Sequence, residues 1–150
     1  MLSFYLSPQI QAVIPIQGLI KVMTLETSSL TSIPDVLQVV MGLYSYGGDI
    51  VWIVDLPYLL NLTPLYLTNT RQLCSIFILR EDHQTIGFAV PEIGQILTLK
   101  ESQLHRDYTN PSSRQFSWCI DGIYTTATAT MARIQRKKIF ELLKIREMAF

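Results

Sequence analysis

The stretch SIPDVLQVVMGLYSYGGDIVWIVDL, residues 32–56, decides the fold class of this chain. Its last part, Ile50–Asp55, is a continuous run of mainly β-branched residues, which is typical of a strand buried on both faces. Gly47 and Gly48 precede this run, and glycine adopts the positive φ angles that a tight hairpin requires. Asp55 stands where it can cap a short helix, residues 56–60, that has proline in its first turn.

Similar short runs occupy most of the remaining chain. They are rich in aliphatic and aromatic residues and are separated by Gly, Asn, Asp and Ser, a pattern that predicts small β-barrels or a sandwich. A C-terminal helix is predicted at about 137–148, because apolar residues recur there at helical spacing. The remaining predicted strands are Leu2–Leu6, Leu19–Leu25, Leu73–Leu79, Ile86–Val90, Ile93–Leu99, Gln115–Thr125 and Ala127–Gln135.

A weak internal repeat divides these runs into two groups. The segment Met23–Leu30 resembles Leu97–Leu104, and Gly42–Ser45 resembles Gly122–Thr125. The paired segments occur in the same order in both halves, so we expect two similar lobes within one domain of residues 1–150. The expected bounds are about 1–66 for lobe 1 and about 72–135 for lobe 2.

Composition indicates an ordered protein. Of its 150 residues, 49% are hydrophobic and 16% are charged, which provides enough apolar surface for a packed core. No apolar stretch approaches the roughly 20 residues of a membrane-spanning helix, and no basic n-region of a signal peptide precedes Lys21. We therefore expect a cytoplasmic protein without direct membrane insertion. Cys74 and Cys119 form no Cys-x-x-Cys pair and are expected to be buried.

The sequence contains no recognisable catalytic or metal-binding pattern. His83 lies in an expected polar hairpin loop and His105 begins a second polar loop, so both are interpreted as solvated. Gly42–Gly48 is followed by Asp49 where a phosphate loop requires lysine. We expect no enzymatic activity, no cofactor and no bound metal.

Charge is unevenly distributed along a chain whose formal net charge is zero. Residues 133–150 carry six basic and two acidic side chains, a balance of +4, which leaves −4 on the remainder. A solvated helix face is the simpler interpretation. The alternative is a small β-barrel that binds nucleic acid through this basic segment and exposed aromatic side chains. The candidates for such side chains are Tyr5, Tyr44, Tyr46 and Tyr124.

The motifs in residues 32–56 resemble those of the CheW-like domain family. The family pattern is matched by Ile33-Pro34, Gly42, Gly48 and the strand end at residues 53–56, which reads Ile-Val-Asp-Leu. The resemblance extends upstream and downstream over nearly the whole chain. It implies a mainly β fold of two five-stranded, SH3-like barrel lobes that meet at a hydrophobic seam and are followed by a short C-terminal helix.

The resemblance also implies a function. It indicates a non-catalytic adaptor that couples a chemoreceptor-type sensor to a CheA-like histidine kinase in chemotaxis, phototaxis or pilus-control signalling. The kinase regulatory domain is expected to dock on lobe 1, at residues that the sequence leaves unknown. Sheet edges and apolar strand surface in residues 33–62 favour this lobe. The cytoplasmic tip of a methyl-accepting receptor is expected in the seam, and no nucleic acid is expected to bind.

Four receptor-facing positions follow from the same resemblance: Val22, Thr24, Gly42 and Gly47. Gly42 is a position where a small residue would let a partner helix approach. Two of the four depart from the family pattern, because Thr24 stands in place of a glutamate and Gly47 in place of an arginine. These departures predict an altered receptor contact.

Overall fold

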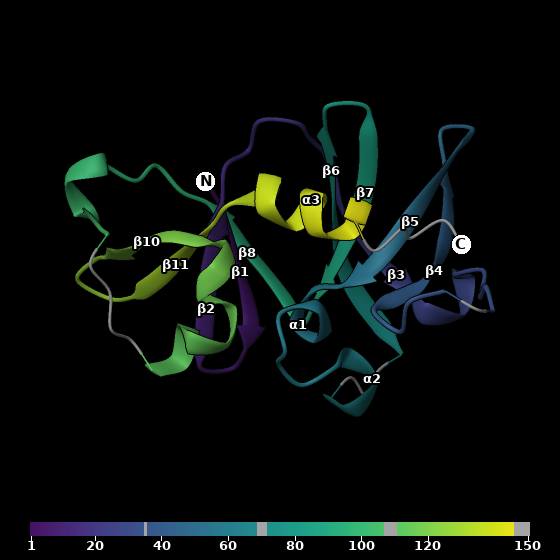
Figure 1. Ribbon diagram of the computed structural model, residues 1–150, viewed down its shortest axis with the longest axis horizontal. Coiled ribbons are helices and arrows are strands. Elements are labelled where there is room, and N and C mark those ends of the chain that lie inside the picture. The colour runs from purple at the N-terminus through teal and green to yellow at the C-terminus, as the bar shows by residue number, and fades with distance from the viewer. Residues whose placement is uncertain (35, 69–71, 107–110, 146–150) are drawn as a thin grey trace.

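The computed structural model describes residues 1–34, 36–68, 72–106 and 111–145 of the chain. Its strands form two sheets, which lie side by side in Figure 1. Sheet A has the order β8-β1-β2-β11-β10-β9 and sheet B has the order β3-β6-β7-β5-β4. The strands of sheet A are β1 (Leu2–Ser7), β2 (Ile10–Ile14), β8 (Glu92–Ile96), β9 (Leu104–His105), β10 (Ile120–Thr125) and β11 (Thr130–Ile134). Those of sheet B are β3 (Leu19–Glu26), β4 (Val40–Tyr46), β5 (Asp49–Asp55), β6 (Leu73–Glu81) and β7 (Gln84–Val90).

Short helices connect or cover the strands. The fold is mainly β with a C-terminal helix, α3, as predicted, and α3 lies between the two groups of strands (Figure 1). Its described part ends at residue 145, so the expected residues 146–148 lie outside the described residues. The helices are α1 (Leu56–Leu59), α2 (Leu65–Thr68) and α3 (Arg136–Ile145), with 3-10 helices η1 (Thr27–Ser29), η2 (Glu101–Gln103) and η3 (Pro111–Cys119).

The two halves of the chain exchange their first hairpins. The β1–β2 hairpin pairs with β8 and, in parallel, with β11, whereas β6–β7 pairs with β3 and, in parallel, with β5. The repeated segments occupy matching places, since β3 leads to η1 and β8 leads to η2. The sequence repeat is therefore visible in the structure, but the expected lobe bounds near residues 66 and 72 need correction. Sheet A takes residues 2–14 and 92–134, and sheet B takes residues 19–90.

The β4–β5 hairpin forms as its glycines predict. Tyr46 pairs with Asp49 across a two-residue turn, in which Gly47 and Gly48 have φ angles of 57° and 85°. Two positive φ angles in succession are the geometry of a type I′ turn, whose twist matches that of paired strands. The turn therefore sets the register of β4 against β5, and it places Gly47 at an exposed tip.

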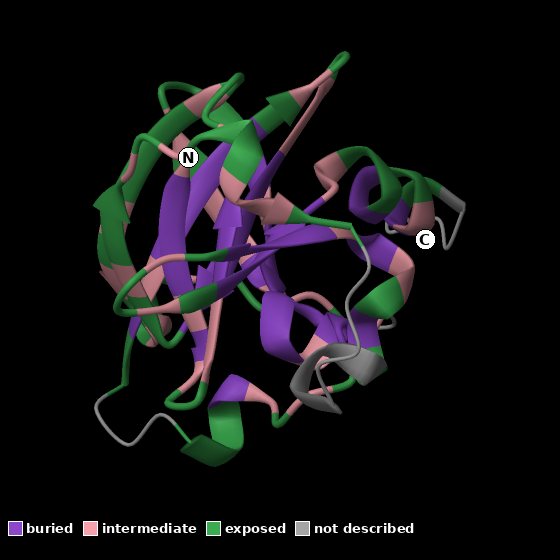
Figure 2. Cartoon of the chain, turned by 90° about the vertical axis from the view of Figure 1, so that its left-hand side faces the viewer, coloured by how far each residue is buried: buried purple, intermediate pink, exposed green. Residues whose placement is uncertain are grey.

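An aromatic core joins the two sheets. The ring centroids of Phe4 in β1 and Phe77 in β6 are 5.0 Å apart, and Phe88 lies 5.6 Å from Phe77. Phe140 of α3 contacts Phe88 edge-on at 5.7 Å. Figure 2 shows the buried segments in the middle of the molecule. Each buried phenylalanine contributes roughly 1.5–3 kcal/mol, so this core holds the lobes in one arrangement.

Two sequence predictions need further correction. The segment Gln115–Thr125 was expected to be one strand, but η3 extends to Cys119 and β10 begins only at Ile120. The buried Phe116 and Cys119 are three residues apart, a spacing that suits one side of a 3-10 helix. The strand expected at residues 93–99 ends at Ile96. Strands β2 and β4 were missed because they lack an uninterrupted β-branched run.

Candidate interaction surfaces

The edge strand β3 presents one face to the seam between the lobes. Val22 pairs with Phe77, and Thr24 pairs with Ser75. Directly opposed residues of antiparallel strands point to the same face, and Phe77 belongs to the core shared with Phe4. Val22 and Thr24 therefore lie together beside the seam. Val22 is 42% exposed although it is aliphatic, which marks it as an available contact.

A second edge strand contributes from the other lobe. Ile96 of β8 pairs with Leu2 of the shared core and is 63% exposed. Its neighbour Ile93 pairs with Phe4 and is partly buried. Exposed apolar side chains thus occur on edge strands of both sheets next to the common core. Sequence reasoning missed Ile96, although the repeat that aligns residues 23–30 with 97–104 makes Ile96 the equivalent of Val22 in the second half of the chain.

Gly47 lies at the tip of the β4–β5 hairpin. A Cβ added there would meet nothing within 4 Å, so the position is open to solvent. The hairpin approaches β3, since the Lys21 ammonium lies 5.1 Å from the centre of the Tyr46 ring. That distance is within cation–π range. The Lys21 side chain of β3 thus reaches Tyr46, the residue that precedes Gly47.

Gly42 occupies a different environment from the other three predicted residues. It is buried, and a Cβ at this position would lie 2.8 Å from the Thr31 carbonyl oxygen and 3.1 Å from the Leu30 Cβ. Thr31 and Leu43 exchange two backbone hydrogen bonds of 2.9 Å at the same place. The backbone that closely approaches Gly42 is thus the chain's own, which gives this glycine a structural role.

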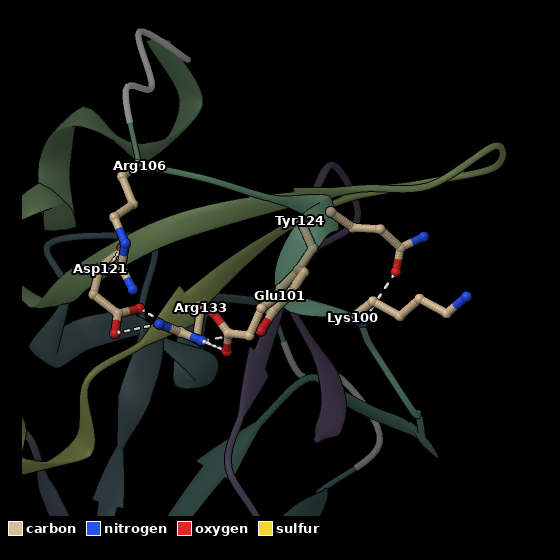
Figure 3. A network of polar contacts seen from close by, with 7 residues as sticks. Lys100, Glu101, Arg106, Asp121, Tyr124 and Arg133 are labelled. Atoms are coloured by element: carbon tan, nitrogen blue, oxygen red, sulfur yellow. Dashed lines mark hydrogen bonds and ion pairs between the residues drawn. The ribbon is translucent and has the colours of Figure 1, made fainter.

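A polar network holds η2 against the β10–β11 hairpin (Figure 3). Arg133 donates to both carboxylate oxygens of Asp121, and its Nη1 donates to the Tyr124 hydroxyl and to Glu101, each at 3.0 Å. The hydrogen bond to Asp121 is the main reason that the pKa of Arg133 is raised. Each of the three Arg133 side-chain nitrogens has a partner, and we interpret the network as structural.

The remaining polar groups of interest are also occupied or buried. Asp55 accepts a hydrogen bond from the Tyr58 amide at 3.1 Å, which confirms its predicted capping role. Burial raises the pKa of the Cys74 thiol to about 11 and that of Cys119 to about 12, so both remain protonated at neutral pH. Within the described residues, no group of three or more His, Cys, Asp or Glu is placed to hold a metal ion. None of the helices in that same part of the chain is long and apolar enough to cross a bilayer.

Comparison with known proteins identifies the family. The family model of the CheW-like domain matches residues 1–134. Among solved structures, the chain is similar to the scaffolding protein TtCheW from Thermoanaerobacter tengcongensis, with a TM-score of 0.74 and 18% sequence identity over 89% of this chain and 86% of that one. No curated protein matches the sequence. The two-lobed fold and the family match agree, and this chain belongs to the CheW-like domain family.

Proposed function

We propose that this protein is a non-catalytic adaptor that couples a chemoreceptor-type sensor to a CheA-like histidine kinase. Membership of the CheW-like family supports a scaffold role in chemotaxis-type signalling, which includes phototaxis and pilus control. The adaptor would work in the cytoplasm, where the receptor tip and the kinase are expected to meet. It would make and break no covalent bond, and would act by holding two partners at once.

One observation carries this proposal. Exposed aliphatic side chains stand on edge strands of both lobes, Val22 on β3 and Ile96 on β8, next to the core that joins the lobes. Edge strands with exposed apolar side chains are liable to pair with other chains unless a partner covers them. An α-helical receptor tip would cover both side chains if it lay along the seam.

The four predicted receptor residues then have unequal roles. Val22 and Thr24 would contact the receptor directly, and Gly47 would lie at the end of the contact. Gly42 would act indirectly, because its close packing under Thr31 supports the start of β4. The absence of the family glutamate at Thr24 and of the family arginine at Gly47 makes this contact less charged than in the family pattern.

The alternative, nucleic-acid binding, receives less support. Two of the six basic residues in the C-terminal segment are ion-paired, Arg133 with Asp121 and Arg136 with Glu81 at 2.8 Å. Tyr124, one of the aromatic candidates, is 1% exposed and cannot stack on a base. A phosphate-binding surface requires free cations, and this pairing removes two of them.

The decisive experiment is a pair of titrations, one with a receptor-tip fragment and one with the kinase regulatory domain. Val22→Asp places a carboxylate in the seam and should weaken receptor binding at least tenfold, since burying an unpaired charge costs several kcal/mol. Kinase binding should remain unchanged. Loss of both affinities, or of neither, would contradict the seam assignment.

The matched control is Leu67→Asp in α2. Leu67 is 64% exposed, so this substitution also converts an exposed aliphatic residue to aspartate. It should leave receptor binding intact. A titration of salt concentration with single-stranded DNA separates the alternative function, because phosphate contacts produce a steep salt dependence.

A further inference from the structure

A pocket of about 350 Å³ opens at the end of sheet B, where η1, β4 and α2 meet. Its wall is formed by Thr27, Gln38, Met41, Asp55 and Leu65, with Tyr66 and Gln72 completing it. A cavity of this size holds one long side chain. Leu65 is 2% exposed and belongs to a hydrophobic cluster formed by strands of sheet B. This packing fixes the position of α2 at the pocket.

Asp55 gives this pocket a negative charge. It is the one Asp or Glu among the described lining residues, which include no Lys, Arg or His. Its carboxylate accepts hydrogen bonds from the backbone amides of Tyr58 at 3.1 Å and Leu65 at 2.8 Å. Both donors are neutral. Burial raises the pKa of Asp55, and the two backbone hydrogen bonds offset only part of that effect. A cation in the pocket would supply the missing charge partner.

The rim of the pocket carries exposed apolar side chains. Tyr66 is 72% exposed and Leu67 is 64% exposed, both on the short helix α2. The Tyr58 and Tyr66 rings lie 6.3 Å apart, and the Tyr58 hydroxyl donates to Gln38 Oε1 at 2.6 Å, which orients that side of the rim. Aromatic faces beside a carboxylate suit a guanidinium or ammonium group, which interacts with both.

We propose that this pocket binds an arginine or lysine side chain of the kinase regulatory domain. Tyr66 and Leu67 would pack on the apolar kinase residues that surround this basic side chain. The inference rests on the proposed adaptor function and locates the kinase contact within it. The lining residues Gln38, Met41 and Asp55 belong to the segment 33–62, whose strand surface favoured lobe 1 as the side that meets the kinase. The charge of Asp55 selects a basic occupant over an acidic or purely apolar one.

Substitutions that place a negative or a positive charge at Gln72 test the proposal. Its side chain is exposed and lines the pocket, and the contacts of this residue with Thr27 use only the Gln72 backbone carbonyl. Gln72 has a φ of 57°, so Gln72→Glu and Gln72→Lys meet the same backbone strain. Gln72→Glu should bind the kinase domain at least threefold more tightly than the wild type, and Gln72→Lys at least threefold more weakly. Both effects should shrink as salt is added.

Several outcomes would overturn the inference. Equal affinities for the two Gln72 variants, or changes in the same direction, would show that no basic side chain enters the pocket. Tyr66→Ala should also weaken kinase binding about tenfold, whereas Val22→Asp, on the seam, should not. A wild-type chain that fails to bind the kinase domain would refute the proposed function itself. A wild type that binds, with Tyr66→Ala and both Gln72 variants unchanged, would refute the pocket alone.

Discussion

Arg133 and Asp121 form a bidentate ion pair across the β10–β11 hairpin, with Nε–Oδ1 and Nη2–Oδ2 distances of 2.6 and 2.9 Å. The Arg133 side chain is 11% exposed and that of Asp121 is 20% exposed. Removing one partner of such a pair leaves the other with a poorly solvated charge. We expect Arg133→Met to lower the free energy of unfolding by about 3 kcal/mol, measured by denaturant titration.

Glu101 provides the control for that measurement. It also pairs with Arg133, at 3.0 Å, but its side chain is 73% exposed. An exposed ion pair contributes little, so Glu101→Gln should cost at most about 1 kcal/mol. Similar losses for the two variants would show that burial does not decide the strength of this network.

Gly42 tests the structural role of a position that the family resemblance assigns to receptor binding. A Cβ there would press on the Thr31 carbonyl at 2.8 Å, and the φ of 155° also disfavours a side chain. Gly42→Ala should therefore lower the free energy of unfolding by about 2 kcal/mol. Gly48→Ala is the matched control, since its φ is 85° but no atom lies within 4 Å. Greater damage from Gly48→Ala would contradict close packing at Gly42.

Local patterns in the sequence predicted the elements that depend on neighbouring residues. The Gly47-Gly48 turn, the capping by Asp55 and the buried run in β5 all follow from residues within a few positions of one another. The exchange of hairpins could not be predicted in this way. It depends on the parallel pairing of β2 with β11 and of β5 with β7, which are contacts between distant parts of the chain.

The candidate site also combines features that depend on neighbouring residues with features that depend on distant parts of the chain. Val22 and Thr24 were named from the family resemblance, and the structure places them two positions apart on one face of β3. Their contact with a receptor stays a prediction. The burial of Gly42 beneath Thr31 depends on how η1 returns to β4, and no spacing in the sequence encodes it. The pocket around Asp55 was also missed, since its walls come from η1, β4, β5 and α2.

Asp55 should make stability depend on pH in an unusual direction. Burial raises its pKa above the ordinary value of 3.8, so the folded state holds this proton more tightly than the unfolded state. The resulting stabilisation is complete below pH 3.8 and is lost as pH rises through the folded pKa. The free energy of unfolding of the wild type, relative to that of Asp55→Asn, should therefore fall as the pH rises from 3.8 through the folded pKa of Asp55. A difference that stays constant, or that rises with pH, would contradict the raised pKa.

Gly47 offers a gain-of-function test of the receptor contact. The family pattern has an arginine at this position, and the open space around Gly47 would accept its side chain without a clash. The φ of 57° imposes a cost of about 1–2 kcal/mol on a residue with a Cβ. Gly47→Arg should therefore fold with slightly reduced stability, and it should bind a receptor-tip fragment of the standard family type about tenfold more tightly, through a charge-assisted contact.

Gly47→Asn is the control that separates the effect of the arginine guanidinium on receptor affinity from the effect of placing any side chain at this positive φ. Asparagine tolerates positive φ better than other residues with a side chain, and it carries no charge. Its affinity for the same receptor fragment should equal that of the wild type, as judged by parallel titrations on folded protein. If Gly47→Arg and Gly47→Asn bind equally, then the hairpin tip does not reach the receptor. The contact would then be confined to Val22, Thr24 and the edge of β8.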